Sequence, residues 1–330
     1  MPSSNATHPQ KNSNISAQTR EIGRSLDQRE LFILRAWLLL PWIALVLCCA
    51  LMPLEALRPG RGGAAMLLVG YLIGGIGFEM GYHRLFAHRS FEASAVVRAL
   101  LVIIGSSAAE GSIFRWAAIH RRHHEFSDRP GDPHSPKGAS WRDKIRGLWH
   151  AHMGWMWNET IGMTEYLRVT DLIQDPVLYR LGRVRMYYLW VGLGLILPAV
   201  LGAWAWGHWT GALRGFLWGG ILRLLLVQNR GFAINSIGHT FGWKTFDTKD
   251  ESRDNPWIAL PTFGAGWQNT HHAFPSSWTN RILWWQLDPA GLVIRGLAWA
   301  GLVWGLRYPN AAQVQGKRVP CLGHPGSSSH

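Results

Sequence analysis

Four apolar blocks, separated by polar stretches, dominate the pattern of this chain. Residues 36–53 and 186–207 contain no charged side chain, and residues 64–78 are apolar and rich in glycine. The fourth block, residues 211–241, is apolar but interrupted by three arginines. Each of the first three blocks is near the roughly 20 residues that a helix needs to cross a bilayer, and the fourth is longer. The pattern predicts an all-α integral membrane protein with spans at about residues 32–54, 64–82, 186–207 and 211–238.

Basic residues lie mainly beside these blocks. The formal net charge is +13, but no nucleic-acid motif accompanies it, and the positive-inside rule explains its distribution better. Residues 84–185 hold many Arg and Lys and are expected in the cytoplasm, whereas residues 54–63 and the turn at His208 and Trp209 are expected outside. Four spans then place both termini and the polar segments on the cytoplasmic side of what we interpret as a bacterial inner membrane.

The ends of the chain differ from its middle. Residues 1–29 are polar and have no signal-peptide pattern, so we expect a disordered cytoplasmic arm. We assign residues 30–310 to one membrane domain and residues 311–330 to a disordered tail. Cys48, Cys49 and Cys321 imply no disulfide framework.

Arg223 falls inside the fourth apolar block. An arginine at mid-membrane depth costs about 2.5–3.5 kcal/mol on insertion scales. We therefore expect Arg223 to face the protein interior, a polar cavity or the lipid headgroups.

Histidine and amide side chains gather in four short segments at the ends of the expected spans or between them. Neutral imidazole is a common nitrogen ligand for iron and zinc, and carboxylates are scarce beside these histidines. Such a rich set could hold two transition-metal ions, which indicates a metalloenzyme. The candidate metal ligands are His83, His88, His120, His123, His124, Asn235, His239, Gln268, His271 and His272.

The spacing of these residues is helical. His120, His123 and His124 stand at i, i+3 and i+4, which puts all three on one face of an α-helix. Residues 268–272 repeat this spacing. Asn235 and His239 lie one helical turn apart.

His83 and His88 do not fit the same rule. They are five residues apart, too far round an α-helix to share a face. Either the helix ends between them or they bind two different metals, and the second alternative suits a dinuclear site. The remaining histidines lack a repeated spacing. We expect a structural role for His208, and a place beside the ligands or the substrate for His134, His150 and His152.

Five segments in this order resemble the membrane-bound fatty acyl desaturases of the stearoyl-CoA, or delta-9, type. They are HRLFAHRSF, WAAIHRRHHEFSDRPGDPHSP, WHAHMGW, NSIGHTFGWKTF and GAGWQNTHHAFP, and the match covers about residues 77–287. The resemblance implies four spans carrying a helical cytoplasmic cap that holds a di-iron site, with dioxygen as co-substrate. It assigns iron ligation to the candidate histidines and a water-linked role to Asn235.

One position departs from the family pattern. Gln268 stands where most of the family has the first histidine of the third box, and Ala265 replaces a glutamate. An amide oxygen is a weaker and harder ligand than imidazole, so this change affects iron binding, redox potential or reaction outcome.

The resemblance predicts an oxygen-dependent desaturase that introduces a cis double bond, at delta-9, into a saturated fatty acyl thioester or acyl lipid. A di-iron hydroxylase or acetylenase on the same scaffold is the alternative. A metal transporter is a third hypothesis, but it would need ligands at the bilayer midplane, whereas these segments lie at the cytoplasmic ends of the spans. The electrons should come from a separate carrier such as a ferredoxin, and no nucleic-acid partner is expected. Five basic residues are candidates to bind the phosphates of an acyl carrier: Arg84, Arg121, Arg122, Lys137 and Arg142.

Overall fold

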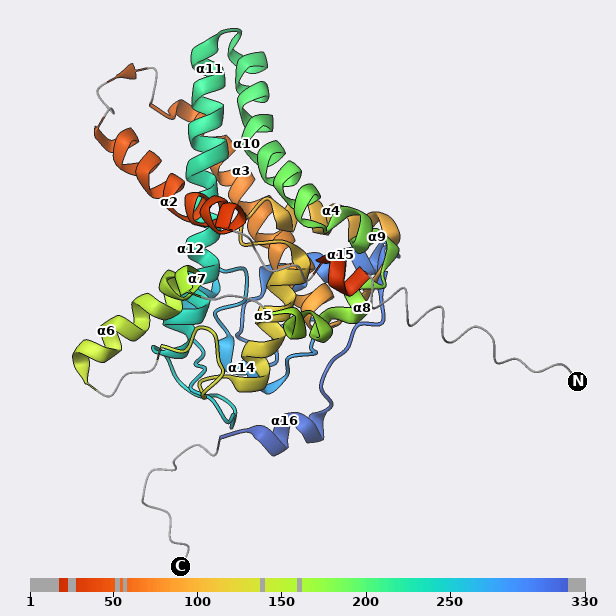
Figure 1. The fold of residues 1–330 in the computed structure, drawn as a ribbon. Coiled ribbons are helices and arrows are strands. Elements are labelled where there is room, and N and C mark those ends of the chain that lie inside the picture. The colour runs from red at the N-terminus through yellow and green to blue at the C-terminus, as the bar shows by residue number, and fades with distance from the viewer. Residues whose placement is uncertain are drawn as a thin grey trace, which may run out of the picture.

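The computed structural model describes residues 18–22, 28–50, 54–55, 58–136, 140–158 and 162–319. These residues are mostly helical (Figure 1). The main elements are α2 (Gln28–Ala50), α3 (Gly60–Phe78), η2 (Glu79–Ala87), β1 (Glu92–Ala93), α4 (Ala95–Ser106), α5 (Ile113–Phe126), α6 (Trp141–Trp149), η3 (His150–Gly154), α7 (Trp155–Asn158), η4 (Met163–Val169), α8 (Thr170–Ile173), α9 (Pro176–Leu181), α10 (Val184–Trp206), α11 (Trp209–Arg214), η5 (Gly215–Leu222), α12 (Arg223–Ser236), η6 (Ile237–His239), α13 (Pro256–Ala259), α14 (Gln268–Ala273), α15 (Pro289–Trp299), β2 (Val303–Trp304) and α16 (Ala311–Lys317).

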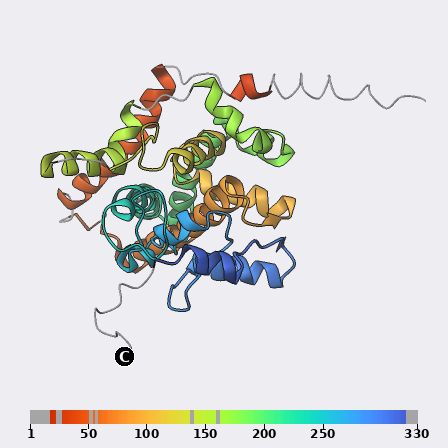
Figure 2. The ribbon, with the colours of Figure 1, turned by 90° about the horizontal axis from the view of Figure 1, so that it is seen from below.

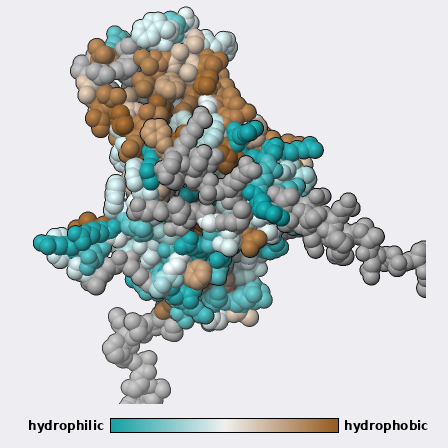
Figure 3. All heavy atoms as spheres, viewed as in Figure 1, coloured by the Kyte–Doolittle hydropathy of each residue, from teal (hydrophilic) through white to brown (hydrophobic). Residues whose placement is uncertain are grey.

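Among the described residues, four continuous helical stretches are long and apolar enough to cross a membrane, which confirms the predicted all-α architecture. Their surfaces are apolar where they face outward, and hydrophobic atoms cover this end of the molecule while hydrophilic atoms cover much of the other (Figure 3). The second stretch continues from an α-helix into a π-helix, and the fourth contains a π-helix and ends in a 3-10 helix. The stretches are Phe32–Ala50, Gly60–Ala87, Val184–Trp206 and Trp209–His239.

Glycines bring the third and fourth stretches together. A side chain at Gly215 would meet the carbonyl oxygen of Pro198 at 2.0 Å, and one at Gly202 would meet the carbonyl oxygen of Gly211 at 2.2 Å. Only glycine permits backbones to approach this closely. The packing of α10 against α11 and η5 therefore depends on these positions.

Arg223 faces the protein interior, the first of the three environments expected from the sequence. Its guanidinium donates hydrogen bonds to the carbonyl oxygens of Ser107 (2.9 Å), Gly194 (3.0 Å) and Gly219 (3.3 Å). Backbone carbonyls thus satisfy a cation that the apolar stretch would otherwise leave unpaired.

The remaining elements form a cap at one end of the spanning helices (Figures 1 and 2). Strand β1 pairs antiparallel with β2, with Glu92 opposite Trp304 and Ala93 opposite Val303. Ser112 caps α5 by accepting a hydrogen bond from the backbone nitrogen of Arg115. This cap fixes the start of the helix that carries three of the candidate ligands.

Helices occupy described parts of both ends that the sequence predicted to be disordered. Residues 18–22 are helical, and Glu21 accepts a hydrogen bond from the hydroxyl of Tyr179 at 2.7 Å. At the other end α16 begins with a capping box between Asn310 and Gln313. Lys317 donates to the carbonyl oxygen of Ala273 at 2.7 Å. Polar composition alone did not reveal these tertiary contacts, and the other residues of both ends lie outside the described residues.

Candidate metal centre

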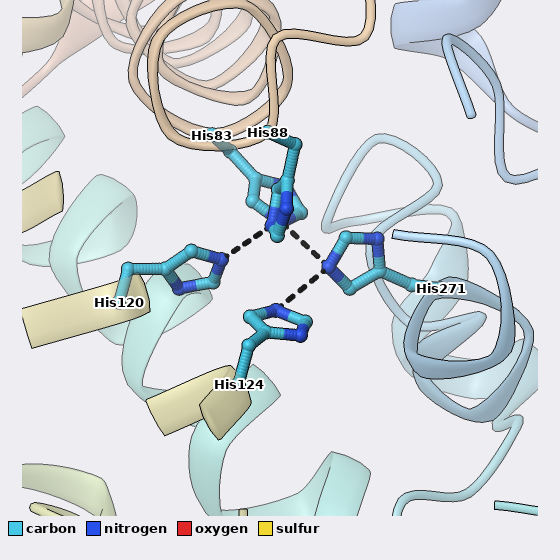
Figure 4. Close-up of side chains that lie close together, drawn as sticks. All are labelled: His83, His88, His120, His124 and His271. Atoms are coloured by element: carbon cyan, nitrogen blue, oxygen red, sulfur yellow. Dashed lines mark hydrogen bonds between the residues drawn. The ribbon is translucent and has the colours of Figure 1, made fainter. Parts of the chain in front are cut away.

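Five histidines from three separate segments converge at the cap end of the spans (Figure 4). One nitrogen from each lies within 4.8 Å of all the others. The Nε2 atom of His83 is 3.0 Å from that of His271, and the Nε2 atom of His88 is 2.7 Å from that of His120. We call this set the five-histidine cluster: His83, His88, His120, His124 and His271.

A π-helix explains how His83 and His88 share one cluster. They lie at the end of η2, where the backbone nitrogen of His88 donates to the carbonyl oxygen of His83 at 3.2 Å. This i to i+5 bond is the π-helical repeat, so side chains five residues apart return to the same face. The structure therefore places both residues in one cluster, which α-helical geometry would not allow.

A second group of histidines lies beside the first. Nitrogens of His123, His239 and His272 lie within 4.8 Å of one another, and we call these residues the three-histidine cluster. The amide of Gln268 joins them, with its Nε2 atom 3.2 Å from Nε2 of His239 and 3.0 Å from Nε2 of His272. Asn235 lines the adjoining cavity.

Two helices supply both clusters. On α5, His120 and His124 point into the five-histidine cluster while His123 enters the other. On α14, His271 and His272 divide in the same way. The i, i+3, i+4 spacing read from the sequence therefore serves two adjacent groups, a geometry that fits two ions.

Carboxylates hold several of these rings in place, and the sequence interpretation missed them. In each pair the Nδ1 atom faces a carboxylate oxygen, which leaves Nε2 turned into a cluster. Asp128 and Asp132 follow the second histidine box directly and could have been noticed on that ground. The pairs are His83 with Glu79 (2.7 Å), His123 with Asp132 (3.0 Å), His239 with Asp128 (2.8 Å) and His272 with Asp250 (2.7 Å).

The donor set suits metal ions. The Nε2 atom of His123 and the Oε1 atom of Gln268 are buried, and neither has a hydrogen-bond partner among the described residues. Turning the Gln268 amide over would direct Oε1 toward the three-histidine cluster. Neutral imidazoles with carboxylate partners are the ligands that transition metals such as iron favour.

Burial keeps the cluster histidines neutral. It lowers the pKa of His88, His120, His124 and His271 well below the usual value, and neighbouring histidines lower it further. Burial also lowers the pKa of His272 to about 4, although Asp250 opposes the shift. The lone pairs are therefore free to bind a metal at neutral pH.

These shifts predict acid sensitivity of the metal-free protein. Histidines whose pKa values fall on folding bind more protons in the unfolded chain, so stability decreases as pH falls from about 7 toward 4. We expect the unfolding temperature in detergent to drop between pH 7.5 and pH 5. The pH dependence of the unfolding free energy should correspond to uptake of more than one proton on unfolding. A constant unfolding temperature across this range would contradict the neutral cluster.

The other histidines lie in different surroundings. His134 packs on His123 with ring centroids 4.2 Å apart, and its ligand atom groups with those of His123 and Asp132. The Nδ1 atom of His152 is 2.9 Å from the Ser236 hydroxyl. His150 lies in η3, and His208 occupies the turn before α11, far from both clusters.

The five basic residues proposed to bind phosphate do not form one group. Arg84 is fully buried, with two hydrogen bonds to Asp288 at 2.7 and 2.9 Å, which excludes it from a phosphate site. Arg121 binds Asp171 and backbone carbonyls in a structural role. Arg122 donates to the carbonyl oxygen of Gly131 and Arg142 is exposed over Trp141, whereas Lys137 lies outside the described residues.

A cavity of about 50 Å³ adjoins both clusters. His83 and His120 contribute from the first cluster, and Gln268 and Asn235 from beside the second. Trp155 and Met156 line it from the cap. An apolar chain in this cavity would lie against the two groups of histidines.

Comparison with known proteins agrees with this geometry. Residues 61–307 match the fatty acid desaturase family. The chain is 43% identical over 258 residues to the hex-5-enoyl-[acyl-carrier protein] acetylenase of Moorena producens, covering 77% of this chain and 79% of that protein. It is 36% identical over 256 residues to the sn-1 stearoyl-lipid 9-desaturase of Synechocystis, covering 77% and 74%. An acyl-CoA desaturase of Saccharomyces cerevisiae is 31% identical over 277 residues, covering 81% and 52%.

The chain therefore belongs to the fatty acid desaturase family. Its relatives are oxidoreductases that act on fatty acyl chains, as the sequence resemblance implied.

Proposed function

We propose that the protein uses two iron ions and dioxygen to remove two hydrogens from adjacent carbons of a fatty acyl chain. The observation that carries this proposal is the pair of adjacent histidine clusters beside a cavity that His83, His120 and Gln268 line. One ion would be held by the five-histidine cluster. The other would be held by the three-histidine cluster with Gln268, and Asn235 would bind through water.

The chain's own residues provide position and surroundings. When bound, the ions supply the redox chemistry with dioxygen. An external donor supplies the electrons for the reduction of dioxygen that the acyl chain does not provide. The four carboxylates beside the clusters fix the imidazole rings and their tautomers. Buried apolar side chains such as Phe78 and Trp155 exclude water from the acyl chain.

The product distinguishes this proposal from its alternatives. Membrane lipids of a host expressing the chain should gain acyl groups with one new cis double bond, with delta-9 the position suggested by the family resemblance. Gas chromatography with mass spectrometry of derivatised lipids measures this. Hydroxylated or acetylenic chains without any new alkene would reject desaturation in favour of the alternative reaction.

Acetylene formation is the second candidate, and a specific relative favours it. The Moorena producens protein, 43% identical, is named an acetylenase that acts on an acyl-carrier-protein substrate. The same scaffold would then remove hydrogens from an existing alkene. An acyl-carrier protein is accordingly one candidate carrier for this chain, besides CoA and lipid.

Gln268 provides a direct test of how ligation affects the outcome. If Gln268 only replaces a ligand, Gln268→His should retain activity and leave the bond position unchanged. If it directs the chemistry, the substitution should change the ratio of alkene to other oxidised products. Product ratios from the same lipid analysis read both outcomes, and a wholly inactive, metal-loaded variant would contradict both.

Electron supply and orientation complete the proposal. The cap would face the cytoplasm of a bacterium, and its basic residues would attract an acidic carrier such as a ferredoxin. Turnover by purified protein with dioxygen and acyl substrate, but without a reductant or carrier, would contradict the need for this partner.

A further inference from the structure

The cavity beside the clusters extends from the cap toward the spanning helices. Trp155, Met156 and His134 line it from the cap. Glu79 and Arg230 line it from the side of the spanning helices, because Glu79 precedes His83 on η2 and Arg230 precedes His239 on the fourth stretch. Glu110 lies in the loop before α5, beside Gly231 on that fourth stretch. Arg230 lies nine residues before His239, about 13 Å at 1.5 Å per residue. An acyl chain entering from the cap would pass the clusters and then meet these charged groups.

Arg230 is an unusual residue for the end of a hydrocarbon pocket. We call the end of the cavity on the side of the spanning helices the floor. Its side chain is almost fully buried, and its three guanidinium nitrogens have no hydrogen-bond partner among the described residues. The nearest carboxylate oxygen is that of Glu79, 3.7 Å from Nη1. The guanidinium also lies 5.2 Å from the ring centre of Phe78.

Glu110 completes this floor. Its Oε1 atom is buried without a hydrogen-bond partner among the described residues. A side chain at Gly231 would meet that oxygen at 2.8 Å, so Glu110 lies directly beside the helix that carries Arg230. Burial raises the pKa of the Glu110 carboxyl to about 8 although Arg230 opposes the shift. A hydrocarbon tail packed on these groups would leave them unsolvated, which costs free energy.

The space beyond the floor is filled. Two turns further along the same helical stretch, Arg223 occupies the interior between the spanning helices. Its Cγ atom would lie 3.0 Å from a side chain at Gly70, and its Nη1 atom 3.8 Å from one at Gly74. Arg223 therefore occupies the interior along this axis past Arg230.

We infer that the substrate chain ends at a stop formed by Glu110 and Arg230, so that only a few carbons lie beyond the clusters. The cavity of about 50 Å³ has room for roughly three to five water-sized groups at about 10–15 Å³ each. The reacting carbons would then be positioned from the methyl end of the chain. This inference rests on the proposed function, but on long chains it moves the new bond from delta-9 toward the methyl end. It adds a substrate class: acyl chains oxidised near the methyl terminus.

Product analysis across chain lengths tests the stop. A host without an oxygen-dependent desaturase, expressing the protein, is given saturated acids from hexanoic to octadecanoic. We expect the new bond at a constant, short distance from the methyl end. A bond nine carbons from the methyl end of octadecanoic acid would overturn the stop while supporting the proposed function, whereas no oxidised chain at any length would count against the proposed function.

Binding gives a measurement that does not require turnover. Retention of labelled fatty acids on purified protein should stop increasing with chain length at a longer acid for Arg230→Leu than for wild type, because the new room extends only as far as Arg223. The acids in that interval should be retained about tenfold better or more by Arg230→Leu. Glu110→Gln is a second variant that keeps the side-chain volume. Arg295→Leu, at an exposed position of α15, removes the same charge elsewhere and should behave as wild type. Equal chain-length profiles for wild type and both floor variants would overturn the inference.

Discussion

Replacing His271 with alanine should abolish turnover and reduce the metal content from about two ions per chain to about one. The Nε2 atom of His271 lies 3.0 Å from that of His83 and 3.1 Å from that of His124, so its loss opens the five-histidine cluster at its centre. Elemental analysis and product formation, measured on the same purified sample, give both readouts.

The matched control is His208→Ala. His208 is exposed in the turn before α11 and remote from both clusters. This variant should retain both metals and normal turnover. An active His271→Ala enzyme with full metal content would show that the five-histidine cluster is not the reaction centre.

Arg84→Ala should destabilise the fold strongly. The guanidinium joins Asp288 to Glu79, and all three side chains are buried. Removing one partner of such a network leaves unpaired buried charges, which costs about 3–5 kcal/mol. Glu79 also holds His83, so metal retention should fall together with the unfolding temperature measured in detergent.

Arg142→Ala provides the contrast, because the sequence assigned both arginines to phosphate binding. Arg142 is exposed and stacks on Trp141, so its loss should leave the unfolding temperature unchanged. If Arg84→Ala folded normally and only raised KM for an acyl carrier, the structural role assigned here would be incorrect.

Sequence patterns predicted the large elements and failed at tertiary detail. Apolar blocks of span length and helical histidine spacing are local signals, so the four stretches and the arrangement on α5 followed directly. The pairing of His83 with His88 required a π-helix, which no periodicity rule anticipates.

Long-range pairing explains the other differences. Nothing in the sequence indicated that Arg84 has a buried partner, because Asp288 lies 204 residues away along the chain. Asp250 reaches His272 across 22 residues that include α13 and connecting loops, so sequence spacing carries no geometric information about this pair. Charged residues in the interior therefore needed the fold before their roles could be assigned.

Metal content of the purified wild-type protein tests the central claim most directly. Two clusters that share α5 and α14 predict about two transition-metal ions per chain, with iron bound after expression in iron-rich medium. Elemental analysis of a folded, monodisperse sample measures this. Less than half an equivalent of any transition metal would contradict a dinuclear centre.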